Sequence, residues 1–191
     1  MRKYRLIQMA IIGATALCII ALIFFRPKGE RSSDISIYKA DLTLSIQRLE
    51  GEMLHMVLED RPVYMGLDTF PIGSLRNVAK GKLFMSFSNS TCPPCLDGAF
   101  RIVDEVFGSL EQESCLFFVC EDAPLRLYDN FMGKRLLNVS GGFNFTQEQT
   151  NYPVFFTISE FLEIDNVHIF NKLDVGRTKR FLEEYVKDLV K

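Results

Sequence analysis

The chain has 191 residues, enough for one domain of ordinary size and an additional segment. Hydrophobic residues make up 48% of it, including 17 Phe, so a substantial apolar core can form. The formal net charge is −2 at pH 7, and no basic stripe with interleaved aromatic residues occurs. We therefore expect no nucleic acid partner.

Residues 6–25 form a run of 20 residues without a charge. A helix of that length rises roughly 30 Å, which matches the hydrocarbon core of a bilayer. A cleavable signal peptide is the alternative, but its apolar region usually spans only about 7–15 residues. The single match to a cleavage site, at residues 14–16, lies inside the run. We predict a basic tail at residues 1–5 and an uncleaved transmembrane anchor at residues 6–25.

Residues 26–65 are expected to hold a linker and a juxtamembrane helix. The polar segment 26–35 suggests the linker. The helix is indicated by apolar residues at helical spacing, Leu42, Ile46, Leu49, Met53 and Met56. This stripe lasts barely two heptads, less than a coiled coil needs. We favour a helix that packs on its own domain, with a homodimer through residues 42–56 as the alternative.

Residues 66–191 are expected to form the globular domain. The apolar run Leu83–Phe87 predicts a buried strand, and a helical pattern follows until Gly108 ends it. Cys115–Cys120 is a continuous apolar run, as in a strand that is buried on both faces. A strand, a helix and a strand in about forty residues indicate a βαβ unit with parallel strands.

The rest of the domain predicts two further strands and a final helix. Residues 121–150 are polar, with a candidate helix around Leu125–Leu136. Val154–Ile158 has a strong β pattern, and Val167–Phe170 can pair with it in the antiparallel direction. A helical apolar face runs from Phe181 to Val190. The expected fold class is α/β, with a central mixed sheet flanked by helices.

The motif with the most specific chemistry is Cys92-Pro93-Pro94-Cys95, between the first strand of the βαβ unit and its helix. Free N–H groups and the macrodipole at a helix N-terminus lower the pKa of a thiol from its usual value of about 8.5. Pro93 suits a first helical turn because an N–H there has no partner. We therefore assign Cys92 as the nucleophile and Cys95, one turn later, as the resolving thiol.

The order of elements, the dithiol and Pro153 immediately before a strand resemble the thioredoxin fold. More specifically, they resemble the membrane-anchored thioredoxin-like oxidoreductases of the TlpA type, over roughly residues 66–190. The resemblance implies that Pro153 is a cis-proline, beside which the backbone of Tyr152 pairs with an extended substrate. Substrate contacts are implied at five residues, Tyr152, Pro153, Pro93, Pro94 and Thr91.

Two positions depart from that family. Thr91 stands where the family usually has Trp just before the first cysteine. Ser86 stands six residues before Cys92, where thioredoxin keeps a buried acid. A hydroxyl cannot take a proton from Cys95 as a carboxylate would, so another group or water must accept it.

The resemblance implies a thiol–disulfide oxidoreductase without a cofactor, on a single span in the inner (cytoplasmic) membrane with its domain in the periplasm. It favours a reductant of extracytoplasmic proteins, itself served by a membrane or periplasmic redox partner. The basic residues on the two sides of residues 6–25 are equal in number and do not decide the orientation. A non-catalytic thioredoxin-like binding module, or a copper carrier that uses the same dithiol, is the alternative.

Other uses of the cysteines carry less weight. A structural disulfide between residues 92 and 95 would close a tiny loop and add little stability. A four-cysteine zinc site would need Cys115 and Cys120, which lie five apart in a predicted strand and so face opposite ways. His55 and His168 are better interpreted as surface or packed histidines than as ligands. We therefore expect no metal site.

Overall fold

The computed structural model describes residues 28–59, 61–65, 68–75, 82–108, 115–121, 136–139 and 141–189. The chain divides into two compact units, Met1–Asp41 and Leu42–Lys191, and the second contains the dithiol. None of the helices formed by the described residues is long and apolar enough to cross a membrane. The predicted anchor at residues 6–25 lies outside the described residues.

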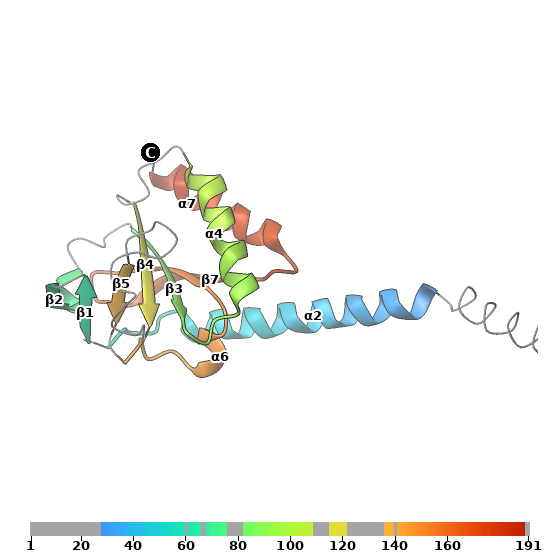
Figure 1. Cartoon of the computed structure of the whole chain (residues 1–191), viewed down its shortest axis with the longest axis horizontal. Coiled ribbons are helices and arrows are strands. Elements are labelled where there is room, and N and C mark those ends of the chain that lie inside the picture. The colour runs from blue at the N-terminus through green and yellow to red at the C-terminus, as the bar shows by residue number, and fades with distance from the viewer. Residues whose placement is uncertain are drawn as a thin grey trace, which may run out of the picture. The chain divides into compact units, whose positions relative to one another are not determined.

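A seven-stranded mixed sheet forms the centre of the second unit (Figure 1), in the order β2-β1-β5-β4-β3-β6-β7. The parallel strands β3, β4 and β5 adjoin the antiparallel strands β6 and β7, and a β1–β2 hairpin extends the sheet beyond β5. The strands are β1 (Pro62–Met65), β2 (Asp68–Pro71), β3 (Leu83–Ser88), β4 (Leu116–Glu121), β5 (Leu136–Val139), β6 (Val154–Ile158) and β7 (Ile164–Ile169).

Helices cover both faces of this sheet. The elements are α2 (Lys28–Met53), the 3-10 turn η1 (Ile72–Leu75), α4 (Pro93–Phe107), α6 (Gln147–Thr150) and α7 (Val175–Leu189). Helices α4 and α7 lie together on one face of the sheet (Figure 1). Their apolar side chains belong to one core cluster with those of β3 and β4. Side chains from the last turns of α2 pack on the other face.

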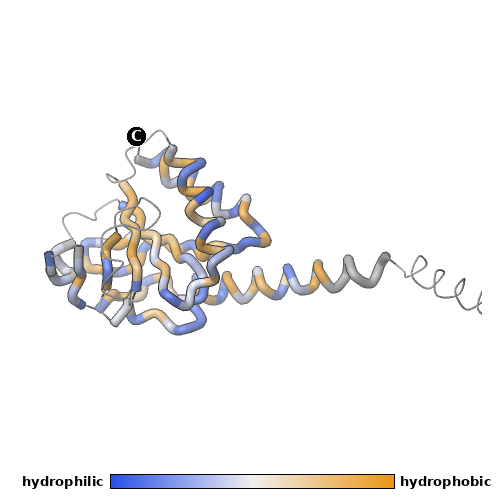
Figure 2. Tube along the Cα trace, viewed as in Figure 1, coloured by the Kyte–Doolittle hydropathy of each residue, from blue (hydrophilic) through white to orange (hydrophobic). Residues whose placement is uncertain are grey.

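The alternation of side chains along each strand creates two apolar layers. On β3, Met85 and Phe87 point toward α4, whereas Phe84 joins the layer beneath α2. Along the central strands, Figure 2 shows the resulting concentration of hydrophobic residues. Both layers are closed to solvent, since Phe84 is 1% exposed and Met85 is 0% exposed.

The structure confirms the predicted order of a strand, a helix and a strand, then two antiparallel strands and a helix. It adds β1, β2 and β5, which the sequence did not predict. Leu136 begins β5, so the candidate helix does not extend to it, and residues 122–135 lie outside the described residues. The β1–β2 hairpin has a proline at each end, which is typical of turns and hides the strands in the sequence. These short strands form only by pairing with each other and with β5.

The predicted linker is wrong from residue 28 onward. Lys28–Met53 is one continuous helix, because the polar residues after Pro27 include no further proline and are tolerated within a helix. The sheet-forming unit begins at Leu42, earlier than the expected boundary at residue 66.

The apolar stripe of α2 is used inside the domain. Ile46, Leu49 and Met53 are 1%, 2% and 0% exposed and belong to the layer that includes Phe84. This agrees with the favoured interpretation, a helix packed on its own domain. A dimer through residues 42–56 would have to draw these three side chains out of that layer.

Candidate functional site

The two cysteines lie at the junction of β3 and α4. Cys92 is the N-cap residue of α4, Pro93 and Pro94 occupy its first positions, and Cys95 completes the first turn. The N–H of Cys95 donates to the carbonyl of Cys92 at 2.9 Å, and the N–H of Leu96 donates to the same oxygen at 3.0 Å. The structure thus confirms that the dithiol begins the helix.

The two thiols differ in exposure and in pKa. Cys92 is half-buried, whereas Cys95 is 2% exposed, and both are free thiols. A hydrogen bond from the side chain of Cys95 is the main cause that lowers the pKa of Cys92, with help from the backbone of Cys95 and the charge of Lys172, against a partial burial that raises it. Burial, followed by the interaction with Cys92, raises the pKa of Cys95 to about 12. The outer cysteine therefore ionises more readily than the inner one, which keeps its proton and donates a hydrogen bond to it.

Thr91 anchors the turn in front of the dithiol. It is 5% exposed, its hydroxyl accepts from the N–H of Ser88 at 2.9 Å and donates to the carbonyl of Thr150 at 2.8 Å. The N–H of Cys92 donates to the carbonyl of Asn151 at 3.2 Å. The small hydroxyl of Thr91, in place of the Trp that is usual in the resembled family, therefore fastens the cysteine turn to the C-terminal end of α6.

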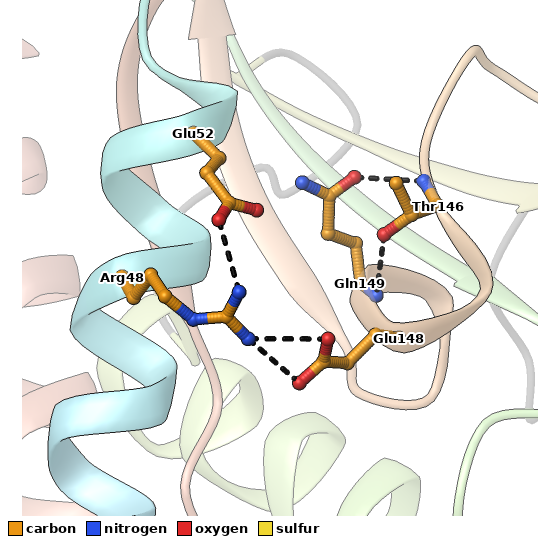
Figure 3. A network of polar contacts seen from close by, with 5 residues as sticks. All are labelled: Arg48, Glu52, Thr146, Glu148 and Gln149. Atoms are coloured by element: carbon orange, nitrogen blue, oxygen red, sulfur yellow. Dashed lines mark hydrogen bonds and ion pairs between the residues drawn. The ribbon is translucent and has the colours of Figure 1, made fainter.

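Helix α6 is itself held from two sides (Figure 3). Thr146 and Gln149 form a capping box around α6, with N–H···O distances of 2.8 and 3.3 Å, and Gln149 is buried. Arg48 of α2 donates to both carboxylate oxygens of Glu148, at 3.1 and 3.2 Å, and to Glu52 at 3.1 Å. A chain of polar contacts thus runs from α2 through α6 to the backbone of Cys92.

The expected cis-proline is not found. Among the described residues no peptide bond is cis, so the bond between Tyr152 and Pro153 is trans. The trans form of an X–Pro bond is favoured by about 0.5–1 kcal/mol, and only the family resemblance argued for cis. Pro153 is buried and accepts a hydrogen bond from the N–H of Phe170 at 2.9 Å.

The other expected substrate contacts are distributed unevenly around the site. Pro93 and Pro94 are exposed beside Cys92. Tyr152 is half-buried, and its side chain packs against both apolar layers, so much of its surface is used within the domain.

Ser86 stands where thioredoxin keeps a buried acid, but the buried carboxylate of Glu121, at the end of β4, contacts its hydroxyl. The Ser86 hydroxyl donates to Oε1 of Glu121 at 2.5 Å, and the N–H of Phe143 donates to Oε2 at 3.1 Å. Glu121 is 4% exposed and pairs in register with Ser88 at the end of β3. Sequence reasoning missed this residue because the register between two strands separated by a helix is not visible in the chain.

The two histidines make their contacts elsewhere in the fold. His168 is 2% exposed, its ring stacks on Phe181 at 4.9 Å between centroids, and His55 lies 2.8 Å from Glu163. Within the described ranges no three side chains of His, Cys, Asp or Glu are grouped so that they could hold a metal ion.

The prediction that Cys115 and Cys120 face opposite ways along one strand is wrong. Cys115 precedes β4, where strand alternation does not apply, and both cysteines are buried in the same apolar layer as Cys95.

Comparisons with known proteins find only distant likenesses. No family model matches the chain, and no curated protein matches it. Among solved structures, an uncharacterized thioredoxin-like protein from Porphyromonas gingivalis has 19% identity and a TM-score of 0.47, covering 71% of this chain and 95% of that one. The exposed lipoprotein thioredoxin Etrx1 of Streptococcus pneumoniae has 15% identity and a TM-score of 0.41, covering 66% and 99%.

Copper-bound ScoI of Arabidopsis thaliana has 10% identity and a TM-score of 0.41, covering 70% of this chain and 99% of its own. All three TM-scores are below 0.5, so the thioredoxin-like fold is assigned from the strand order and from the position of the dithiol.

Proposed function

We propose that this protein is a thiol–disulfide oxidoreductase that exchanges disulfides with protein substrates through Cys92 and Cys95. The observation that carries the proposal is the asymmetry of the pair. An accessible thiol of lowered pKa begins a helix, and a buried thiol of raised pKa lies one turn later within hydrogen-bonding reach. This is the division of labour that a nucleophile and a resolving thiol require.

In the reducing direction, the Cys92 thiolate attacks one sulfur of a substrate disulfide. The bond between Cys92 and that sulfur forms, the substrate S–S bond breaks, and the departing thiolate takes up a proton. Cys95 then loses its proton and attacks the sulfur of Cys92, which releases the second substrate thiol and leaves a Cys92–Cys95 disulfide. The substrate gains two electrons and the protein loses two, so an external dithiol must restore the reduced pair.

The proposal extends to location and direction. We infer a domain held outside the cytoplasm by residues 6–25, as in the TlpA type of oxidoreductase, and a reductant of particular extracytoplasmic proteins. The uncharged run and the order of motifs support this inference. The dithiol–disulfide equilibrium in glutathione buffers tests direction, since a potential below that of the glutathione couple identifies a reductant.

Trapping of the mixed disulfide tests the exchange reaction itself. In a Cys95→Ser variant of the full chain the second step cannot occur, so substrate adducts on Cys92 should accumulate and disappear on reduction. The matched control is Cys92→Ser/Cys95→Ser, which should form none. The absence of adducts in the single variant, together with no measurable dithiol–disulfide equilibrium in the wild type, would overturn the enzyme proposal in favour of a binding module.

A further inference from the structure

The loop that follows β7 is built against the start of α4. Phe170 donates its N–H to the carbonyl of Pro153 at 2.9 Å and is 1% exposed. Its ring lies so close to Gly98 that a Cβ on this glycine would be 2.7 Å from the ring. Gly98 is three residues after Cys95, one turn farther along α4. The backbone that continues from Phe170 is therefore held beside the turns that carry the dithiol.

A tight turn then presents Lys172 to solvent. The carbonyl of Asn171 accepts from the N–H of Asp174, and its side-chain oxygen accepts from the N–H of Leu173, both at 2.9 Å. Asn171 is 3% exposed, whereas Lys172 is exposed. The carboxylate of Asp174 accepts from the N–H of Arg177 at 3.3 Å, at the start of α7. The turn therefore keeps Asn171 buried and leaves Lys172 exposed.

The positive charge of Lys172 favours the ionised form of both Cys92 and Cys95 and so lowers the pKa of each thiol. For Cys92 this effect ranks behind the hydrogen bond from Cys95, so the lysine is a secondary influence on the thiol itself. A charged group that approaches Cys92 from solvent has no such hydrogen bond to dominate its energy. The same ammonium favours the approach of an anionic group and disfavours that of a cationic one.

We propose that Lys172 is a specificity-determining residue that favours disulfides flanked by acidic side chains. The recognised chemistry is an extended protein segment with Asp or Glu near the cysteine that Cys92 attacks. This substrate class rests on the proposed function. The charge that Lys172 places at Cys92 does not, because any reagent that reacts with a thiol can detect it.

Two alkylating reagents of similar size provide the first test. Iodoacetate is anionic and iodoacetamide is neutral, so the ratio of their rates at Cys92 in the reduced full chain reports the local charge, with the modified site identified by mass spectrometry. Lys172→Gln should lower this ratio roughly twofold and Lys172→Glu roughly fourfold, with smaller changes at high salt. Lys187→Glu, the same change at an exposed lysine of α7, is the control and should leave the ratio unchanged. Equal ratios in Lys172→Glu and Lys187→Glu would overturn the proposal.

Two peptide disulfides of equal length, one with acidic and one with basic flanks, provide the second test. The wild type should reduce the acidic peptide faster, and Lys172→Glu should abolish or reverse that preference. If both peptides exchange and the preference is the same in Lys172→Glu, the assignment of Lys172 fails while the enzyme proposal stands. If neither peptide exchanges although alkylation responds to Lys172, the substrate class proposed for Lys172 fails while its charge at Cys92 is confirmed, and the trapping of adducts in Cys95→Ser decides the enzyme proposal separately.

Discussion

Cys92 and Cys95 have the same side chain, and their surroundings make them chemically different. Cys92 has the N-terminus of α4 and the thiol of Cys95 as neighbours, which favour its ionised form. Cys95 is surrounded by the apolar layer of α4, β3 and β4, where an ionised sulfur loses its hydration. Each thiol also affects the other, because one proton shared between two sulfurs stabilises a single negative charge.

The hydrogen bond from Cys95 should therefore control the titration of Cys92. In Cys95→Ala the donor is lost, so the lowered pKa of Cys92 should rise toward its ordinary value and the midpoint of the alkylation profile should move to higher pH. Cys95→Ser keeps a hydroxyl donor and should give an intermediate midpoint. Iodoacetamide rates measured across pH check this, and the same midpoint in all three proteins would contradict it.

At the scale of elements, the register between strands decides which side chains meet. The pairing of β3 with β4 brings Glu121 to the hydroxyl of Ser86, and it does so although a whole helix separates the two residues in the chain. The trans bond before Pro153 and the capping box of α6 likewise set the backbone that meets Cys92. The surroundings of the dithiol are thus built by β3, β4, α6 and the segment before β6, and not by its own motif alone.

Two glycine substitutions in helices should change the free energy of unfolding in opposite directions, because Gly98 packs against Phe170 and Gly51 has no close neighbour. In Gly98→Ala the new Cβ would be 2.7 Å from the ring of Phe170, so the variant should lose roughly 1–3 kcal/mol of unfolding free energy through overpacking. In Gly51→Ala nothing lies within 4 Å of the new Cβ, and the higher helix propensity of Ala should add roughly 0.5–1 kcal/mol.

Urea unfolding of both glycine variants against the wild type measures these changes. A gain in stability for Gly98→Ala would contradict the close packing of Phe170 on α4. Gly98→Ala/Phe170→Leu should recover part of the loss of the single variant, since the smaller side chain leaves room for the methyl group.

At the scale of the whole unit that begins at Leu42, one buried carboxylate joins three elements. Glu50 of α2 accepts from the N–H of Ile169 on the edge strand β7 at 2.8 Å and forms an ion pair with Arg177 of α7. Its Oε1 lies 3.4 Å from Nδ1 of His168, whose Nε2 lies 2.8 Å from Thr178. The polar edge of the sheet is thereby closed by a side chain of α2.

Removal of this charge should weaken the unit. Glu50→Gln loses the ion pair with Arg177 and should cost roughly 1–3 kcal/mol of unfolding free energy, since hydrogen bonds to charged groups contribute that much. Glu52→Gln, on the same helix with a half-exposed side chain, is the matched control and should cost less than about 1 kcal/mol. Urea unfolding at neutral pH measures both, and equal costs would contradict the role of Glu50.

The same carboxylate makes stability depend on pH. Burial raises the pKa of Glu50, but hydrogen bonds from His168, Arg177 and the backbone of Ile169 together outweigh it and lower the pKa below 4.5. A lowered folded-state pKa contributes stability above the unfolded-state value, and this share is lost as the pH falls through the folded-state value. Between about pH 5 and about pH 3, the free energy of unfolding should therefore fall more steeply for the wild type than for Glu50→Gln, as urea unfolding at each pH would show.

The sequence by itself determined the order of most elements and the position of the dithiol. Short continuous apolar runs mark the buried strands, periodicity of 3.6 marks α4 and α7, and a cysteine followed by Pro93 marks a helix start, because these signals are local. They remain readable without any knowledge of what packs against them. The assignment of Cys92 and Cys95 to the first turn of a helix was therefore correct from the chain alone.

Only the tertiary structure decided the features that depend on distant residues. The β1–β2 hairpin and β5 exist through pairing, and the carboxylate of Glu121 reaches Ser86 through strand register. The charge of Lys172 acts on the pKa of Cys92 from a loop whose Phe170 packs on Gly98. The helical start of α2 and the trans bond before Pro153 likewise correct expectations drawn from composition and resemblance. Local patterns carry the identity of an element, but the free energy of contacts between elements sets their neighbours, and that information is spread over the whole fold.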